Sequence, residues 1–430
     1  MIRRGLLLAT LLLLASPRAS AEPAKRLTLP NGLPVIVKPT WSTEIVAVEL
    51  LLGVSCLDEP RQKSGIRYLV QRMLLQGTQR QSGSAMARQL AAVGGVIDTS
   101  VGLDYVEIYA LVPAEGFEAA LTLLADAARN PAFLPDEVRA QGIAAQKAAK
   151  AARDDPFQQT YLAFRDALYG DHPYAGATFG EQHSLAALTR EDLTAFHAQH
   201  YRPNNAALAI CGGVGEARVM RAARQAFGDW LPGPPFPVPE AEVHPLSASV
   251  LAARELPIRR AHLILGFSAP SVAELDYYAV QVIDSLLSGG ASSRLPQHLR
   301  EDLGLVYDVS SFYPTLSQKS HLAIYAVTAP QHLAAVKSGI LQVLTNLMEQ
   351  PVAPHELTRA KRYLLGSYAI SHQRMKHQAY SLAWYETLGL GCDFADRYAA
   401  GIEAVTPADV QRTARLILNR FVFAVTVPRV

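Results

Sequence analysis

The sequence is poor in the features that mark several classes of protein. Its 430 residues contain only three cysteines, Cys56, Cys211 and Cys392, and these lie far apart. A disulfide scaffold or a structural zinc site shows an even set or close pairs of cysteines, so neither is expected here. At most one disulfide is possible, and we favour a buried free thiol without a function for each cysteine.

An excess of charge is also absent. The chain has 40 Lys and Arg residues against 38 Asp and Glu residues, a formal net charge of +2, with no long run of either sign. Proteins that bind nucleic acid or membrane surfaces usually carry such runs. We therefore expect no nucleic-acid partner, and charge identifies no other ligand.

Only the first residues contain an extended apolar run. Two arginines precede the apolar residues 5–15, and the small-residue sequence ASA follows at 19–21. This order is typical of a secretory signal peptide, which we assign to residues 1–21, and it predicts a soluble, periplasmic mature protein starting near Glu22. No later segment approaches the ~18 uninterrupted apolar residues of a transmembrane helix, so no membrane span is expected.

A segment rich in proline and glycine divides the chain nearly in half. Residues 228–245 read GDWLPGPPFPVPEAEVHP, a composition typical of an exposed linker, which we place at residues 231–245. A chain of this length is expected to form two or three domains at roughly 100–200 residues each. We predict one domain at residues 22–230 and a second at residues 246–430.

The first half alternates strand and helix patterns. Residues 26–39 and 43–55 alternate like antiparallel strands of a hairpin or meander around Asn31-Gly32. Helical segments, two strands, long helices and a last strand follow. The expected segments are helices at 65–78, 83–96 and 115–131, two strands within 98–113, and the last strand at 205–214.

The second half repeats this order. Its expected segments are strands at 261–270, 304–314 and 320–330, and helices at 275–289, 293–304 and 334–351. A duplication of one unit explains the match better than two unrelated domains. The predicted fold class is α+β, with two homologous domains that each consist of a mostly antiparallel sheet packed with helices.

Several ordered motifs resemble the M16 family of zinc metallopeptidases, the relatives of pitrilysin and the mitochondrial processing peptidase, and in particular its half-length bacterial members. The motifs are LPNGLPVIVKP, the helix ending in MLLQGT, HPYAGATFGEQHSLAALTREDLTAFHAQHYRPNNAALAICGGV, and GGASSRLPQHLREDLGLVYDVSS. The resemblance covers essentially the whole mature chain. It implies two domains of the M16 peptidase type.

The family's zinc signature is replaced in this chain. In the family, the helix before MLxxGT carries H-x-x-E-H, in which two histidines bind zinc and the glutamate activates the metal-bound water. Here these places hold Tyr68, Gln71 and Arg72. A phenol with a pKa of about 10 is a poor ligand, a protonated arginine repels a cation, and an amide accepts no proton from water.

The family's remaining ligand, a glutamate on a later helix, is missing as well. The corresponding position falls within Gln146 to Ala148, with Lys147 between them, and no glutamate occurs between Glu137 and Glu181. The resemblance therefore implies no metal and no cofactor in this chain. The replaced helix positions have two interpretations, an ordinary polar face or a specific structural role such as an arginine in the vacated cation position.

A second family feature is retained. Members of the family hold the substrate backbone with an arginine and a tyrosine seven residues apart, and LREDLGLVY matches with Arg300 and Tyr307. Arg300 is expected in the last turn of a helix, Gly304 allows the chain to reverse, and Tyr307 starts the next strand, so the two polar ends can converge. Both groups donate hydrogen bonds to a carbonyl that gains negative charge.

The resemblance implies a division of labour between two chains. The chain fits the non-catalytic subunit, inactive alone, of a heterodimeric zinc peptidase whose partner carries H-x-x-E-H and the zinc. An extended peptide substrate is expected to pair with the strand near Gly94 to Tyr105. The alternative is a stand-alone pseudoenzyme that binds peptides or serves in assembly without any peptidase; an active peptidase with relocated ligands is the least favoured interpretation.

Overall fold

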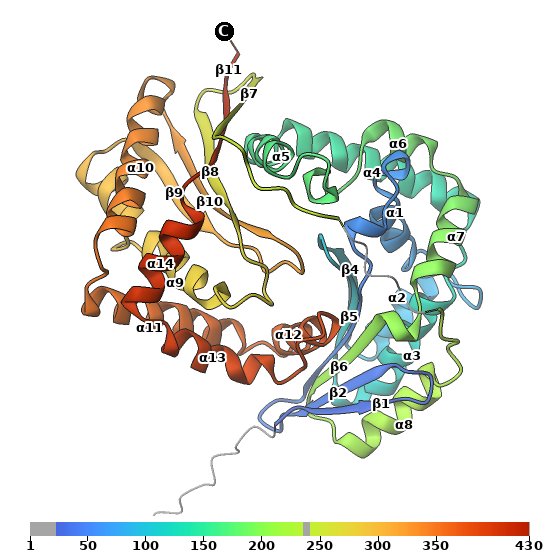
Figure 1. Cartoon of the computed structure of the whole chain (residues 1–430). Coiled ribbons are helices and arrows are strands. Elements are labelled where there is room, and N and C mark those ends of the chain that lie inside the picture. The colour runs from blue at the N-terminus through green and yellow to red at the C-terminus, as the bar shows by residue number, and fades with distance from the viewer. Residues whose placement is uncertain (1–22, 235–240, 430) are drawn as a thin grey trace, which may run out of the picture.

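The computed structural model describes residues 23–234 and 241–429. The predicted signal peptide and the start of the predicted mature chain at Glu22 lie outside the described residues, as does the middle of the predicted linker. The two halves of the chain face each other as two lobes, with the first half running from blue to green and the second from yellow to red (Figure 1).

The first half contains a sheet of six strands in the order β1-β2-β6-β3-β5-β4. Its strands are β1 (Lys25–Thr28), β2 (Pro34–Pro39), β3 (Ile45–Leu52), β4 (Val96–Val101), β5 (Val106–Pro113) and β6 (Ala206–Gly212). All neighbours are antiparallel except β2 and β6, which run parallel. Because β4 stands last in this order, it forms one edge of the sheet.

The second half contains a sheet of five strands in the order β7-β11-β8-β10-β9. Its strands are β7 (Val250–Leu256), β8 (Ala261–Ala269), β9 (Val306–Phe312), β10 (Ser320–Thr328) and β11 (Val422–Pro428). The parallel pair of β7 and β11 corresponds to β2 and β6, and β9 occupies the edge that β4 occupies in the first sheet; β1 has no counterpart among the described strands. This strand-for-strand correspondence agrees with the duplication predicted from the sequence.

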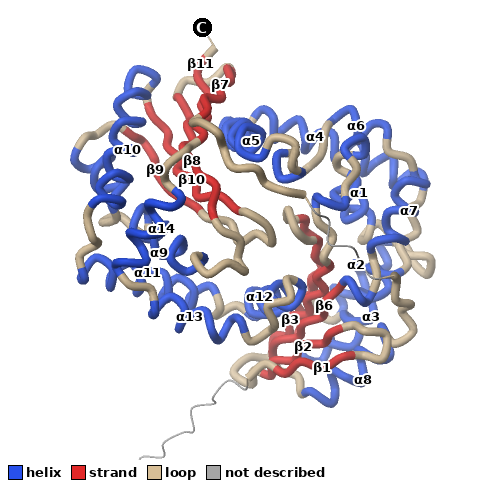
Figure 2. The backbone as a smooth tube through the Cα atoms, in the orientation of Figure 1, coloured by secondary structure: helices blue, strands red, loops and turns tan. Residues whose placement is uncertain are grey.

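Helices cover both sheets (Figure 2). The first half contributes α1 (Ile66–Met73), α2 (Gly83–Ala92), α3 (Phe117–Arg129), α4 (Pro135–Asp154), α5 (Pro156–Tyr169), α6 (Gln182–Ala187), α7 (Arg190–His200) and α8 (Glu216–Phe227). The second half contributes α9 (Tyr277–Ser288), the π-helical segment η6 (Pro296–Asp302), α10 (Leu333–Glu349), α11 (Pro354–Ser371), α12 (Met375–Thr387), α13 (Phe394–Ala404) and α14 (Pro407–Ile417). None of the helices in the described part of the chain combines the length and hydropathy needed to cross a bilayer.

The two halves exchange one helix each. Helix α5 leaves the first half and packs on β7, β8 and β11 of the second sheet, whereas α12 leaves the second half and packs on β3 and β6 of the first sheet. Figure 1 shows both helices between the lobes. Each sheet therefore has a face that is completed by the other half, and this explains why the inner strands β3, β6, β8 and β10 are buried along nearly their whole length.

The expected arrangement of the first strands needs one correction. The hairpin around Asn31-Gly32 is formed by β1 and β2, with Gly32 at a φ of 88°. Strand β3 does not continue this hairpin as a meander, because β6 lies between β2 and β3 and pairs with both. A strand from residues 206–212 thus enters the sheet between two segments that are neighbours in the sequence.

Buried polar contacts join the halves on the α5 side. His321 on β10 lies between the hydroxyls of Tyr161 and Tyr169 on α5, at 2.9 and 2.8 Å from its ring nitrogens. Burial lowers the pKa of His321 to about 3. Asp104, in the loop after β4, accepts hydrogen bonds from the Tyr174 hydroxyl and from the backbone amide of Ser317 in the second half.

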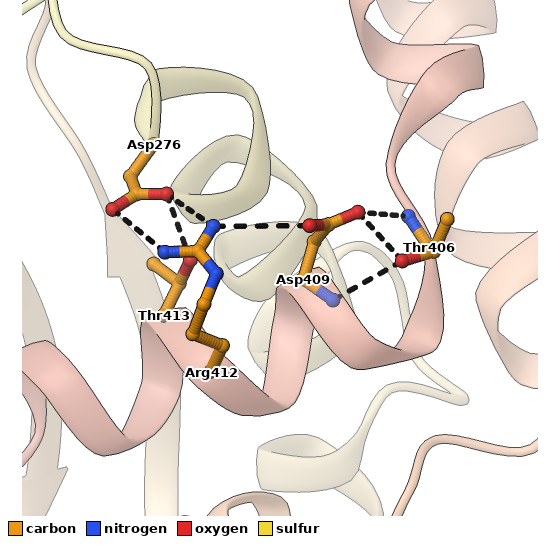
Figure 3. Close-up of polar contacts among 5 residues, drawn as sticks. All are labelled: Asp276, Thr406, Asp409, Arg412 and Thr413. Atoms are coloured by element: carbon orange, nitrogen blue, oxygen red, sulfur yellow. Dashed lines mark hydrogen bonds and ion pairs between the residues drawn. The ribbon is translucent and has the colours of Figure 1, made fainter.

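The second half also has its own exposed polar connection. Thr406 and Asp409 form a capping box at the start of α14, and Arg412 one turn later binds Asp276 at the start of α9 with both guanidinium ends (Figure 3). The nearby guanidinium lowers the pKa of Asp276. The contact fixes two helices of one lobe relative to each other.

Candidate functional site

Helix α1 is held in place by a buried arginine. The helix starts at Gly65, whose φ of 95° lies in the left-handed region and suits glycine. Arg67 is 1% exposed; its guanidinium donates to Glu59 and to the carbonyls of Val54 and Gly102, each at 3.0 Å. These contacts tie the helix to the loop after β3 and to the turn between β4 and β5.

Gln71 faces the sheet and is hydrogen-bonded through both the nitrogen and the oxygen of its amide. It is 1% exposed; its amide nitrogen donates to the backbone carbonyl of Glu107, and its oxygen accepts from the Tyr201 hydroxyl at 2.7 Å. Burial raises the pKa of Tyr201 far above its ordinary value, so this hydroxyl stays protonated and donates. Gln71 therefore links α1, β5 and the end of α7 as a neutral structural group.

Tyr68 and Arg72 form a separate pair on the adjoining face of α1. Arg72 Nη1 donates to the Tyr68 hydroxyl at 3.3 Å, and Arg72 Nε donates to Gln141 Oε1 on α4 at 2.9 Å. The Tyr68 ring makes an edge contact with Phe179, with 5.1 Å between ring centroids. Both polar side chains are half-buried. The structure thus brings all three predicted positions together on one helix.

This set of side chains does not fit a zinc ion. Its ligands would be a protonated phenol, a guanidinium and an amide that is already bonded to Glu107 and Tyr201. Within residues 23–234 and 241–429, no group of three or more His, Cys, Asp or Glu side chains is arranged to hold a metal ion. The three cysteines are free thiols, with Cys211 and Cys392 buried and Cys56 half-buried.

Strand β4 runs beside this helix at the edge of the first sheet. Among the described strands it pairs only with β5, and the Thr99 hydroxyl on β4 donates to the Gln71 carbonyl on α1 at 3.4 Å. Its outward-facing residues are exposed, including Val96 and Asp98. The unpaired backbone groups of such an edge can accept a further extended strand.

Arg300 and Tyr307 lie at the corresponding edge of the second sheet, in η6 and at the start of β9. Gly304 between them has a φ of 61° and reverses the chain as expected. The two side chains have separate partners: Arg300 Nε donates to Glu301 at 2.9 Å, whereas the Tyr307 ring lies under the guanidinium of Arg260 at 4.1 Å. Tyr307 is 57% exposed. Their joint action on a substrate remains a prediction.

Comparisons with known proteins match both halves. Residues 35–181 match the model "Insulinase (Peptidase family M16)", and residues 187–364 match the model "Peptidase M16 inactive domain". The chain belongs to the M16 peptidase family. Curated relatives of this M16 chain include an uncharacterized zinc protease of Mycobacterium tuberculosis, 28% identical over 94% of this chain and 93% of the relative, and another of Mycobacterium leprae, 27% identical over 92% and 89%.

Solved structures support the M16 fold. A protease from Helicobacter pylori is similar with a TM-score of 0.90 at 20% identity, covering 95% of this chain and all of the other. A structure titled as a peptidase M16 inactive domain, from Pseudomonas fluorescens, is similar with a TM-score of 0.86 at 22% identity, covering 95% and 98%. The α+β class with two M16 domains is therefore confirmed.

Four residues of the M16 site were missed by the sequence reasoning. Arg67 and Tyr201 fix α1, Gln141 binds Arg72, and Arg260 covers Tyr307. Gln141 lies one to two helical turns before residues 146–148, where we expect the position that corresponds to the family's distal ligand. The only sequence signal for Arg67 is its place on the apolar side of an amphipathic helix, where a charged residue needs a buried partner.

Proposed function

We propose that this chain is the non-catalytic subunit of a heterodimeric M16 peptidase. In this proposal the chain is exported to the periplasm, completes a peptide-binding chamber and presents Arg300 and Tyr307 to the zinc site of a partner that carries H-x-x-E-H. The observation that carries the proposal is Gln71, which occupies the place of the catalytic base and whose two hydrogen bonds serve packing.

The peptide-binding part of the proposal is supported by β4. Its open edge lies against the helix that carries Tyr68, Gln71 and Arg72, so an extended chain paired with β4 would run beside that helix. Main-chain pairing along an edge strand is tolerant of sequence. The expected substrates of the complex are extended peptides or unfolded segments.

The first experiment is purification of the tagged mature protein from its native cell envelope extract under gentle conditions, followed by mass spectrometry of the proteins that co-elute in stoichiometric amount. A chain of similar size that carries H-x-x-E-H would support the heterodimer, and zinc is expected in that chain. Elution alone or as a homodimer would contradict it and would favour a stand-alone pseudoenzyme that binds peptides or serves in assembly.

A further inference from the structure

Arg72 has an orientation fixed by neutral groups and no carboxylate to pair with. Its Nε and Nη1 atoms donate to Gln141 and Tyr68, and its guanidinium carbon lies 5.6 Å from the Tyr68 ring centroid. No ion pair of the described residues includes it, whereas Arg67 on the same helix is paired with Glu59. Arg72 is half-buried, so its guanidinium carries a positive charge that no carboxylate of the described residues neutralises.

The free donors of this arginine suit a carboxylate. A guanidinium has five N–H donors; two are used here, so one on Nη1 and both on Nη2 are left among the described contacts. A carboxylate can accept two of them in parallel, the geometry that arginine favours. The Tyr68 hydroxyl accepts from Arg72 and keeps its own hydrogen, which gives a further donor beside the same place.

The position of Arg72 indicates a peptide as the source of the carboxylate. The preceding residue, Gln71, is bonded through its backbone carbonyl to Thr99 on β4, so Arg72 lies one residue from the contact between α1 and the edge strand. An extended peptide that pairs with β4 runs past this helix. Its C-terminal carboxylate, or the side chain of an aspartate or glutamate, is the anion that such a peptide carries.

We infer that Arg72 and Tyr68 form a carboxylate-binding site for extended peptides that pair with β4. This inference rests on the proposed peptide-binding function and narrows its ligands to peptides with a terminal or side-chain carboxylate near α1. The position that holds a metal cation in zinc-bearing relatives thus carries a fixed organic cation that binds an anion.

The test measures the binding of fluorescein-labelled octapeptides of alternating Ser and Val by fluorescence anisotropy. Three forms are compared: the free acid, the C-terminal amide, and an amide whose last residue is glutamate. We expect the free acid to bind the wild-type chain about tenfold or more tightly than the amide, since hydrogen bonds to charged groups are strong. Tight binding of the glutamate amide identifies side chains as a second source of the same group.

Substitutions test whether Arg72 causes the preference for the free acid over the amide. Arg72→Gln should abolish the difference between acid and amide, and Arg72→Lys, which keeps the charge but not the two-pronged geometry, should reduce it. Arg139→Gln, on the exposed face of α4 and with the same change of charge, is the matched control and should keep the difference. Thermal melting of each variant checks that it folds.

The possible failures are distinguishable. Equal affinity for the acid and both amides, or a preference that survives in Arg72→Gln, would overturn the carboxylate site and leave the peptide-binding function standing. Absence of binding by all three peptides would count against the peptide-binding function itself, and with it against the inference.

Discussion

The edges of the two sheets, at β4 in the first half and at β9 in the second, differ in the burial and the partners of their polar side chains. At the α1 and β4 edge, Gln71 is buried and bonded on both sides of its amide. At the η6 and β9 edge, Arg300 and Tyr307 are exposed; Arg300 bonds Glu301, and Tyr307 stacks against Arg260. In our proposal, the first edge holds structural groups at positions that are catalytic in zinc-bearing relatives. The second edge carries exposed groups, as the proposed contribution to another chain's site requires.

The strongest test of the difference between the two edges is a carboxylate at position 71. Gln71→Glu places an acid against the Glu107 carbonyl, where an ionised group finds one donor, Tyr201, and one repulsive acceptor. We expect a loss of about 3–5 kcal/mol at pH 8, measured by urea unfolding. Burial should raise the pKa of the new carboxyl above its unfolded value of about 4.3. The stability of the variant should therefore fall as pH rises above this value, and its loss relative to the wild type should shrink near pH 4.

The control for this variant is Gln89→Glu on the exposed face of α2, which should change stability by no more than about 0.5 kcal/mol. A Gln71→Glu variant as stable as this control at pH 8 would show that Gln71 is not a structural group. The α1 face would then be an ordinary polar surface.

The next effect comes from the donor on the other side of the same amide. Tyr201→Phe removes the hydroxyl and leaves the Gln71 oxygen buried without a partner, at a cost of about 1–3 kcal/mol. Tyr307→Phe, the same change at the exposed edge, is the matched control and should have little effect on thermal unfolding. Equal losses in the two variants would remove the distinction between the edges.

A smaller effect of opposite sign is expected on the other face of the first sheet. Glu49 on β3 is fully buried beneath α12, and neither of its carboxylate oxygens has a hydrogen-bond partner among the described residues. Burial and then the neighbouring Glu107 carboxylate raise the pKa of Glu49 well above its usual value, against an opposing effect of Lys376. Glu107 itself lies 3.6 Å from the Lys376 ammonium.

Glu49→Gln should therefore stabilise the protein by about 1–2 kcal/mol at pH 8, because it removes a carboxyl that burial disfavours in its ionised form and adds a donor for Glu107. The sign follows from linkage. Between its unfolded pKa of about 4.3 and its higher folded pKa, the folded state binds more protons, so wild-type stability falls as pH rises. The melting temperatures of the wild type and of Glu49→Gln should differ at pH 8 and converge towards pH 5. The control variant Glu255→Gln, at an exposed position, should show no such trend.

The sequence predicts the local elements and the duplication because these depend on short-range patterns. The turn at Asn31-Gly32 and the reversal at Gly304 are local and appear where expected, whereas α1 ends at Met73, short of the predicted end at residue 78. The insertion of β6 and the exchange of α5 and α12 are not predictable in this way, since an apolar face shows that a helix is buried but not on which sheet. Strand β7 was missed because it is mostly exposed and lacks a regular alternation.

The candidate site is likewise predictable only in part from the sequence. The identities of Tyr68, Gln71 and Arg72 already exclude the zinc chemistry, because that judgement needs only the side-chain groups. Their partners come from α4 and α7, far away in the sequence, and depend on how these helices are rotated against α1. Gln141 is an example: a helical pattern shows that residues 135–154 form a helix but not which of its faces meets Arg72.

The smallest effect on stability should accompany the largest effect on function at the second edge. Arg300→Ala and Tyr307→Phe change exposed side chains, so each should alter unfolding by about 0.5 kcal/mol or less. If they serve the zinc site of a partner, each should lower the turnover of the reconstituted complex by about tenfold or more, while size-exclusion chromatography shows the two chains still associated. Unchanged turnover in both variants would remove the pair from the mechanism, and the open edge would then need another explanation, beginning with the stacking of Arg260 on Tyr307.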